Sequence, residues 1–211
     1  MYNNLIYTNG CSFTEGGFYE NKTDCWPWKI NVKGYDVLND AIGGGSNYRI
    51  MRTCMDTVTR MHGRIFVAII QWTGQGRAEQ PGGDSFIRIN LAESVEHNPL
   101  EPSRAVLIEN WLDQINVLDR FFTVLNIPVY FFNGFTNINS YTIDNKLDKE
   151  RIEKKFKTID RKKWILPPET SLKEWIDDKS GKAFLSDGHL KPEKNIIIAD
   201  KIRGLIFDND C

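Results

Sequence analysis

The most informative stretch of the chain is Leu5-Ile6-Tyr7-Thr8-Asn9-Gly10-Cys11-Ser12-Phe13-Thr14. Its first three residues form a short apolar run typical of a buried strand. The strand ends at a turn that contains Gly10, and Gly10 permits a tight turn there. The hydroxyl of Ser12 follows the turn directly. Because ligand sites in parallel α/β sheets lie at the carboxyl ends of strands, Ser12 is expected at the edge of the sheet where a site forms.

Further apolar runs predict three more strands, at 35–38, 65–70 and 128–132. The run at 65–70 is continuous, as in parallel strands that are buried on both faces. Helical spacing separates these runs. Ser46 is a plausible cap for a helix that carries apolar residues at about one-turn intervals up to Met61. Two further helices are expected, at 106–125 and, entered through Pro192-Glu193, at 196–206.

The alternation of strands and helices predicts a three-layer α/β/α fold with a mostly parallel, flavodoxin-like central sheet. We expect residues 1–211 to form a single domain, since the length suffices for one full core. The stretches 75–101 and 136–182 fit the pattern poorly. They are interpreted as loops or short helices that lie above the sheet and shape a site.

The charge balance argues against a nucleic-acid binder. The chain has 26% charged residues and a formal net charge of −1, so attraction to phosphate backbones is weak. A basic run at 154–163 is interleaved with acidic residues, which favours a solvated helix. We therefore expect no nucleic-acid partner.

Cysteine usage and hydropathy set the expected compartment. The four cysteines form neither a CxxC pair nor a metal-ligand spacing with histidine, so no metal is expected. No cofactor is expected either. Cys11, at a strand end, and Cys54, on a helix face, favour buried free thiols over disulfides. No run is long enough to span a membrane, and no signal-like start is present. We expect a cytoplasmic protein without a membrane partner, or a virion-associated one if the gene belongs to a phage.

A second feature near the other end of the chain completes a catalytic interpretation. Asp187-Gly188-His189 is followed by Pro192 and an apolar helix. A serine near the start and an Asp/His pair near the end can serve as nucleophile, base and orienting carboxylate. A serine at this position can also simply cap a turn, and the histidine can belong to a surface turn. The combination favours a serine hydrolase with Ser12, His189 and Asp187 as its catalytic residues.

Acyl transfer also needs donors for the developing oxyanion. The backbone N–H of Ser12 is one candidate, and Gly44, within Gly43-Gly44-Gly45, is a second. The glycine triplet can alternatively cradle a phosphate, although it lacks both the GxGxxG spacing and the P-loop ending. Thr73 follows the most hydrophobic strand and is the third candidate. Gln71 and Arg77 are candidates for substrate binding, and Arg77 can equally form a surface salt bridge.

These pieces, in this order, resemble the four sequence blocks of the SGNH (GDSL-type) hydrolase superfamily. Gly10-Cys11-Ser12-Phe13-Thr14 matches the first block, G-D-S-x-T, with cysteine in place of aspartate, and a G-C-S-F-T start is found in compact phage and bacterial members. Asn39, Ala41, Gly44 and Ser46 follow the second block. Asp187 and His189 resemble the last block, which is usually Asp-x-x-His.

The resemblance implies a serine ester hydrolase with Ser12 as nucleophile, His189 as general base and Gly44 as an oxyanion donor. The implied substrates are small-molecule or carbohydrate esters, with O-acetyl groups favoured. Thr73 takes the place of the asparagine of the third block, and Asp187 lies two residues before His189 rather than three. These departures keep a second interpretation open, in which the chain is a weak or inactive binding or structural protein on the same fold. Oligomeric state and natural substrate do not follow from the sequence.

Overall fold

A four-stranded parallel sheet forms the centre of the protein, in the order β2-β1-β3-β6. The computed structural model describes residues 4–82, 85–90, 103–135, 143–180, 183–186 and 188–207. The strands are β1 (Leu5–Asn9), β2 (Asp36–Asn39), β3 (Ile65–Trp72) and β6 (Val129–Asn133). From β1 the chain runs outward to β2, then crosses to β3 and on to β6. The direction therefore reverses between β1 and β3, which is where open α/β sheets place their ligands.

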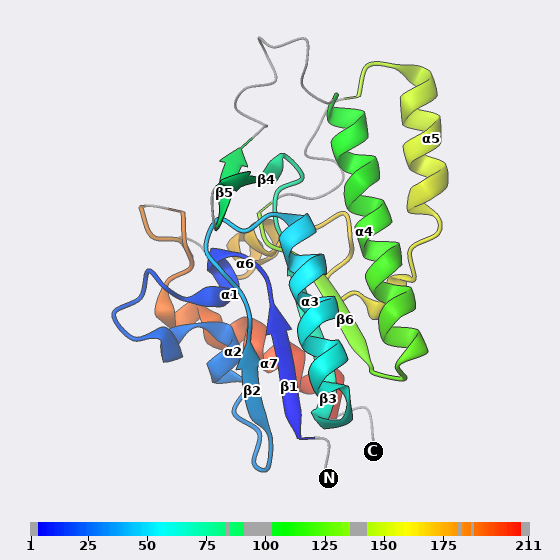
Figure 1. Cartoon of the computed structure of the whole chain (residues 1–211). Coiled ribbons are helices and arrows are strands. Elements are labelled where there is room, and N and C mark those ends of the chain that lie inside the picture. The colour runs from blue at the N-terminus through cyan, green and yellow to red at the C-terminus, as the bar shows by residue number, and fades with distance from the viewer. Residues whose placement is uncertain are drawn as a thin grey trace.

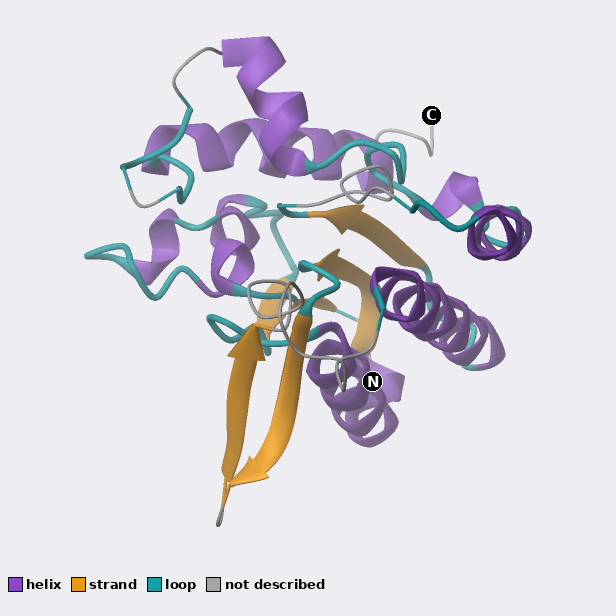
Figure 2. Cartoon of the chain, turned by 90° about the horizontal axis from the view of Figure 1, so that it is seen from above, coloured by secondary structure: helices purple, strands orange, loops and turns teal. Residues whose placement is uncertain are grey.

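Helices cover both faces of this sheet, so the predicted three-layer α/β/α fold is confirmed (Figure 2). One core cluster joins Tyr7 of β1 to α3 (Asn47–Met61) and α4 (Arg104–Val124). The other joins Ile6 to α2 (Trp26–Lys29), α6 (Leu172–Ser180) and α7 (Asn195–Phe207). Neighbouring residues of a strand point to opposite faces, which is why Ile6 and Tyr7 belong to different clusters.

Serine caps begin the two long helices, α3 as the sequence predicts and α4 two residues before the expected Val106. The Ser46 hydroxyl caps α3 by accepting the Arg49 N–H at 3.1 Å, and Ser103 caps α4 by accepting the Val106 N–H at 3.4 Å. The helix expected at 196–206 is α7, entered through the 3₁₀ turn η5 (Pro192–Lys194). The strand expected at 35–38 is β2, shifted by one residue.

The expectation for 75–101 was wrong in its described part. Instead of loops or short helices, β4 (Arg77–Gly82) and β5 (Ser85–Asn90) form an antiparallel hairpin. The hairpin lies beyond the end of the sheet toward which the strands point (Figure 1). The sequence carries a signal for it, because Pro81-Gly82-Gly83-Asp84 precedes a run in which apolar and polar residues alternate. Residues 91–101 lie outside the described ranges.

Short helices do occupy the described part of 136–182. These are α5 (Lys146–Phe156), the 3₁₀ turn η4 (Arg161–Lys163) and α6. The first half of the basic run lies on α5, which pairs with α4 through Arg151–Glu109 and Lys155–Asp113. Most of its charged side chains are exposed, as a solvated helix predicts.

Two further observations concern cysteines and hydropathy. Cys11, Cys25 and Cys54 are buried free thiols, and Cys211 lies outside the described residues. Within the described part of the chain, no helix combines the length and the apolar character needed to cross a bilayer.

Candidate active site

Ser12 and His189 meet, although 177 residues separate them along the chain. The Ser12 Oγ and the His189 Nε2 lie 2.9 Å apart, within hydrogen-bond distance. Ser12 is the first residue of the short helix α1 (Ser12–Glu15), directly after β1, and the position that caps this helix is Cys11. The Ser12 hydroxyl therefore contacts the imidazole rather than capping the turn. This is the geometry that a serine nucleophile and its general base require.

Gln71, at the end of β3, supports the turn that carries Ser12. Gln71 is fully buried, and its Oε1 accepts the Cys11 N–H at 3.2 Å and the Thr14 hydroxyl at 2.9 Å. Its Nε2 donates to the Trp72 carbonyl at 2.7 Å. The sequence placed Gln71 among the candidates for substrate binding. In the structure its amide instead makes its hydrogen bonds inside the protein and holds the turn that carries Ser12.

Two glycines make room for the Gln71 amide. A Cβ on Gly10 would lie 2.8 Å from Gln71 Oε1, and a Cβ on Gly134, which follows β6, would lie 2.1 Å from Gln71 Nε2. Gly10 does not adopt a positive φ. Its requirement for glycine is therefore close packing against Gln71 and Thr14 rather than the tight turn that the sequence suggested.

The glycine turn after β2 lies beside Ser12. Gly44 has a φ of +72°, a left-handed conformation that favours glycine. Glu15 of α1 accepts the Gly43 N–H at 2.8 Å, and Asn39 Nδ2 donates to the Thr14 carbonyl at 2.8 Å. These two hydrogen bonds tie α1 to the turn that contains Gly44. The Glu15 carboxylate also occupies a backbone donor that a phosphate-cradling loop would need, which argues against a nucleotide site here.

Thr73 is positioned through its backbone. Its N–H donates to Asn47 Oδ1 at 2.8 Å, and its carbonyl accepts from Asn47 Nδ2 at 3.1 Å. Because the N–H is already used, only the hydroxyl of Thr73 is left as an oxyanion donor. That hydroxyl is buried and has no hydrogen-bond partner among the described residues.

The segment that carries His189 folds back on itself as a narrow turn. The Leu185 N–H donates to the His189 carbonyl at 2.7 Å, and Phe184 and Leu190 form an antiparallel bridge. The ring of Phe18 stacks on the imidazole, with centroids 3.7 Å apart and planes 23° apart. Asp187, the expected orienting carboxylate, lies outside the described residues.

Arg77, the other candidate for substrate binding, begins β4. Its guanidinium lies 5.3 Å from the centroid of the Phe135 ring. Phe135 in turn packs against Phe13 at 4.0 Å, and the Phe13 ring lies 5.7 Å from that of His189. Arg77 is thus linked to the Ser12–His189 pair through two aromatic rings. No ion pair of Arg77 is found among the described residues.

A buried polar network supports the strand end from the α3 side. Asn9 Nδ2 donates to the Tyr7 hydroxyl at 2.9 Å and to Thr53 Oγ1 at 2.8 Å, and the Tyr7 hydroxyl donates to Asp40 at 3.1 Å. Burial raises the pKa of Tyr7 far above its usual range, so its phenol stays protonated and can donate. Burial likewise raises the pKa of the Cys54 thiol, beside Asn9, to about 12.

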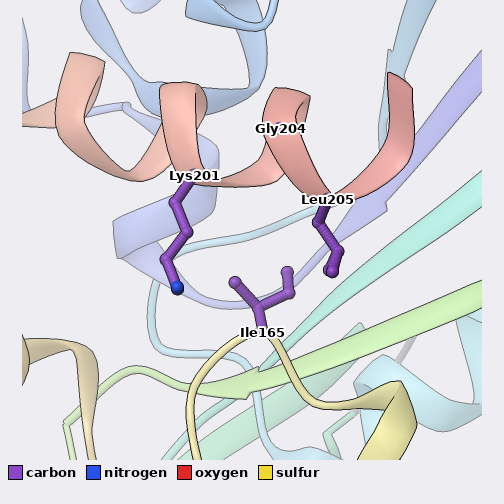
Figure 3. Close-up of a pocket in the computed structure, with 4 residues that line it drawn as sticks. All are labelled: Ile165, Lys201, Gly204 and Leu205. Carbon is purple, nitrogen blue, oxygen red and sulfur yellow. The ribbon is translucent and has the colours of Figure 1, made fainter. Parts of the chain in front are cut away.

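A hollow of about 300 Å³ is lined by Ile165, Lys201, Gly204 and Leu205 on α7 and the segment after η4 (Figure 3). It brings together one lysine and apolar groups, with no nucleophile–base pair. Among the described residues, no cluster of three or more His, Cys, Asp or Glu side chains is placed to hold a metal ion.

Sequence reasoning missed several residues that hold Ser12 and His189 in place. Glu15 directly follows the motif that contains Ser12 and precedes Gly16-Gly17. An acidic side chain at this position was a signal in the sequence that could have been used. Asn47 lies one residue after the predicted helix cap. Phe18 carries no local signal, because its contact with His189 joins opposite ends of the chain.

Comparison with known proteins gives the fold its context. No family model matches the chain, and no curated protein matches it. Solved structures do match over nearly the whole chain, at low sequence identity. A lipolytic protein of the G-D-S-L family from Desulfitobacterium hafniense is 15% identical and has a TM-score of 0.52, with 96% of this chain and 99% of that one covered.

Two further neighbours extend the same picture. The esterase EstA from a Pseudoalteromonas species is 10% identical with a TM-score of 0.56, and 97% of each chain is covered. The acetyl xylan esterase AlAXEase is 13% identical with a TM-score of 0.52, with 94% of this chain and 97% of that one covered. The likeness covers nearly the whole chain. This chain has the fold of the SGNH (GDSL-type) hydrolases.

Proposed function

We propose that this protein is a serine ester hydrolase in which Ser12 is the nucleophile and His189 the general base. The observation that carries the proposal is the 2.9 Å contact between Ser12 Oγ and His189 Nε2, at the edge of the sheet where α/β folds bind ligands. The shared fold with esterases supports it.

The reaction follows from these positions. His189 Nε2 accepts the Ser12 proton as Oγ attacks the ester carbonyl, and a tetrahedral oxyanion forms. The backbone N–H of Ser12, at the start of α1 where no intrahelical acceptor exists, and that of Gly44 are the proposed oxyanion donors, with the Thr73 hydroxyl as the third. His189 returns the proton to the leaving alcohol. Water then hydrolyses the acyl-enzyme by the same proton transfers in reverse.

Asp187 is the proposed orienting carboxylate for the imidazole, on the basis of its position two residues before His189. The proposed substrates are short-chain esters, with O-acetyl groups on carbohydrates favoured. An acetyl xylan esterase and an esterase active on acetylated mannans share the fold, which supports this substrate class.

The test is hydrolysis of p-nitrophenyl acetate by the wild type, Ser12→Ala and His189→Ala at equal folded concentration. We expect each variant to lose at least about three orders of magnitude in kcat, because a nucleophile and its base act as one unit. Ser103→Ala and His62→Ala are matched controls: Ser103 caps α4, both residues are exposed, and neither touches the pair. Both controls are expected to keep the activity.

A covalent probe gives an independent answer. One of the structural neighbours, EstA, is described as inhibited by monoethylphosphonate. We expect a reactive phosphonate ester to add one phosphonyl group to Ser12, detected by peptide mass spectrometry, and to leave Ser12→Ala unmodified. Background rates and no labelling in all proteins would contradict the proposal and favour a binding protein on the same fold.

A further inference from the structure

The loop behind the nucleophile reaches across to the base. Phe18 lies six residues after Ser12, and its ring covers one face of the His189 imidazole, with centroids 3.7 Å apart and planes within 23° of parallel. Nothing in the reaction uses Phe18 chemically. Its position nevertheless links the segment that carries the nucleophile to the segment that carries the base.

A buried hydrogen-bond network fixes this loop to the His189 segment. The hydroxyl of Tyr19 donates to the carbonyl of Leu190, the residue after His189, at 2.6 Å. The same hydroxyl accepts from Asn195 Nδ2 at 2.6 Å, and Asn195 Oδ1 accepts the Trp26 N–H at 3.1 Å. Tyr19 is 9% exposed and Asn195 is fully buried. Phe18 therefore lies beside an anchored residue, and its ring also packs against the Tyr19 ring with centroids 4.2 Å apart.

The two aromatic neighbours of the imidazole differ in geometry. The Phe13 ring lies 5.7 Å from the imidazole and is tilted by 56°, whereas the Phe18 ring is close and nearly parallel. A parallel ring restricts rotation of the imidazole about its Cβ–Cγ bond, and that rotation moves Nε2 relative to Ser12 Oγ. The face of a phenyl ring also attracts the imidazolium that forms during acyl transfer.

We propose that Phe18 is a positioning residue, which holds the His189 imidazole in the orientation that contacts Ser12 and favours its charged form during the reaction. This role rests on the proposed function of the Ser12–His189 pair. In the proposed reaction Phe18 does not contact the reacting atoms of the substrate. Removing the ring face is expected to lower kcat by about 10- to 100-fold with KM changed by less than about threefold, because misplacing a catalytic group acts on the chemical step.

The experiment compares Phe18→Leu, which keeps apolar volume, with Phe18→Tyr, which keeps the ring face. Phe121→Leu is the matched control, on the half-buried α4 ring that packs against Phe122 and lies outside the site. The chain has only three histidines, so the ring signals of His189 can be assigned in NMR spectra with His189→Ala. Protons that lie over an aromatic face resonate upfield, and ring ¹⁵N shifts report which nitrogen carries the proton.

Support consists of an upfield His189 signal in the wild type, its loss together with a fall in kcat in Phe18→Leu, and recovery of both in Phe18→Tyr. Unchanged kcat in Phe18→Leu, or a wild-type His189 signal without the upfield shift, overturns the proposal. If the wild type cleaves no ester, the proposed function fails while the NMR measurements still decide the positional role. A mixture of tautomers that appears only in Phe18→Leu then supports it, and an unchanged tautomer overturns it.

Discussion

The Ser12 and His189 sides of the candidate site are built differently. The Ser12 side is held by hydrogen bonds between backbone groups near Ser12 and three polar side chains, the buried Gln71 and the partly buried Asn39 and Glu15. Outside its own backbone turn, the His189 side is held by a ring stack and one anchored tyrosine, across opposite ends of the chain. Ser12 is thus fixed mainly through the strand ends of the sheet, whereas His189 depends on packing against the loop that follows Ser12.

The substitution with the largest expected effect removes the Gln71 amide, which supports the turn that carries Ser12. Gln71→Leu leaves the Cys11 N–H and the Thr14 hydroxyl without their buried acceptor. Each unsatisfied group costs about 1–3 kcal/mol, so we expect the free energy of unfolding to fall by about 3 kcal/mol. Urea denaturation measures the change.

The matched control for that substitution is Gln114→Leu on α4, whose Oε1 has no hydrogen-bond partner among the described residues. It should change the free energy of unfolding by less than about 1 kcal/mol. Equal losses in the two variants would show that the Gln71 amide does not hold the turn.

The base side is expected to respond less in stability. Tyr19→Phe removes one hydroxyl and leaves the Leu190 carbonyl and Asn195 Nδ2 without that partner. We expect a loss of about 1–2 kcal/mol in the free energy of unfolding, measured by urea denaturation. Tyr48→Phe, at a tyrosine that is 52% exposed, is the control and should stay within about 0.5 kcal/mol of the wild type. A larger loss of unfolding free energy in Tyr19→Phe than in Gln71→Leu would show that the His189 side is held more strongly than the Ser12 side.

The smallest effect is expected for two buried cysteines on the Ser12 side of the site, whose thiols should not react. Burial raises the pKa of Cys54 to about 12 and also raises that of Cys25, whose Sγ donates to the Phe13 carbonyl at 3.0 Å. A raised pKa means less thiolate: at pH 8, roughly one part in ten thousand of a thiol with a pKa near 12 is ionised. Iodoacetamide at pH 8 should therefore leave both cysteines unmodified in the folded protein, as measured by peptide mass spectrometry. Modification of either cysteine within minutes in the folded protein would show that the Ser12 side of the site becomes exposed to solvent more readily than the burial of these thiols indicates.

The same contrast explains what sequence reasoning found. The parallel sheet and its main helices followed from apolar runs and helical spacing, which are local patterns. Ser12 and His189 followed from their motifs and from their order along the chain, and the structure brings them together. The sequence analysis did not predict the hairpin β4–β5, because a stretch rich in glycine and proline favours loops. The roles of Gln71, Phe18 and Tyr19 depend on contacts between distant segments, and a single sequence does not display such contacts.

The packing around Gln71 also has an evolutionary consequence. Gly10 and Gly134 come from the ends of two different strands, and each lies against the amide carried by a third. While Gln71 is present, a side chain at either glycine collides with it. Substitution of Gly134 is therefore tolerated only after Gln71 has become smaller, and a smaller residue at 71 leaves the turn that carries Ser12 without its acceptor. Substitution of Gly10 also needs a smaller residue at Thr14, whose Oγ1 would lie 2.6 Å from the new Cβ. Homologues that keep this site should accordingly vary at these four positions together, as one inherited unit.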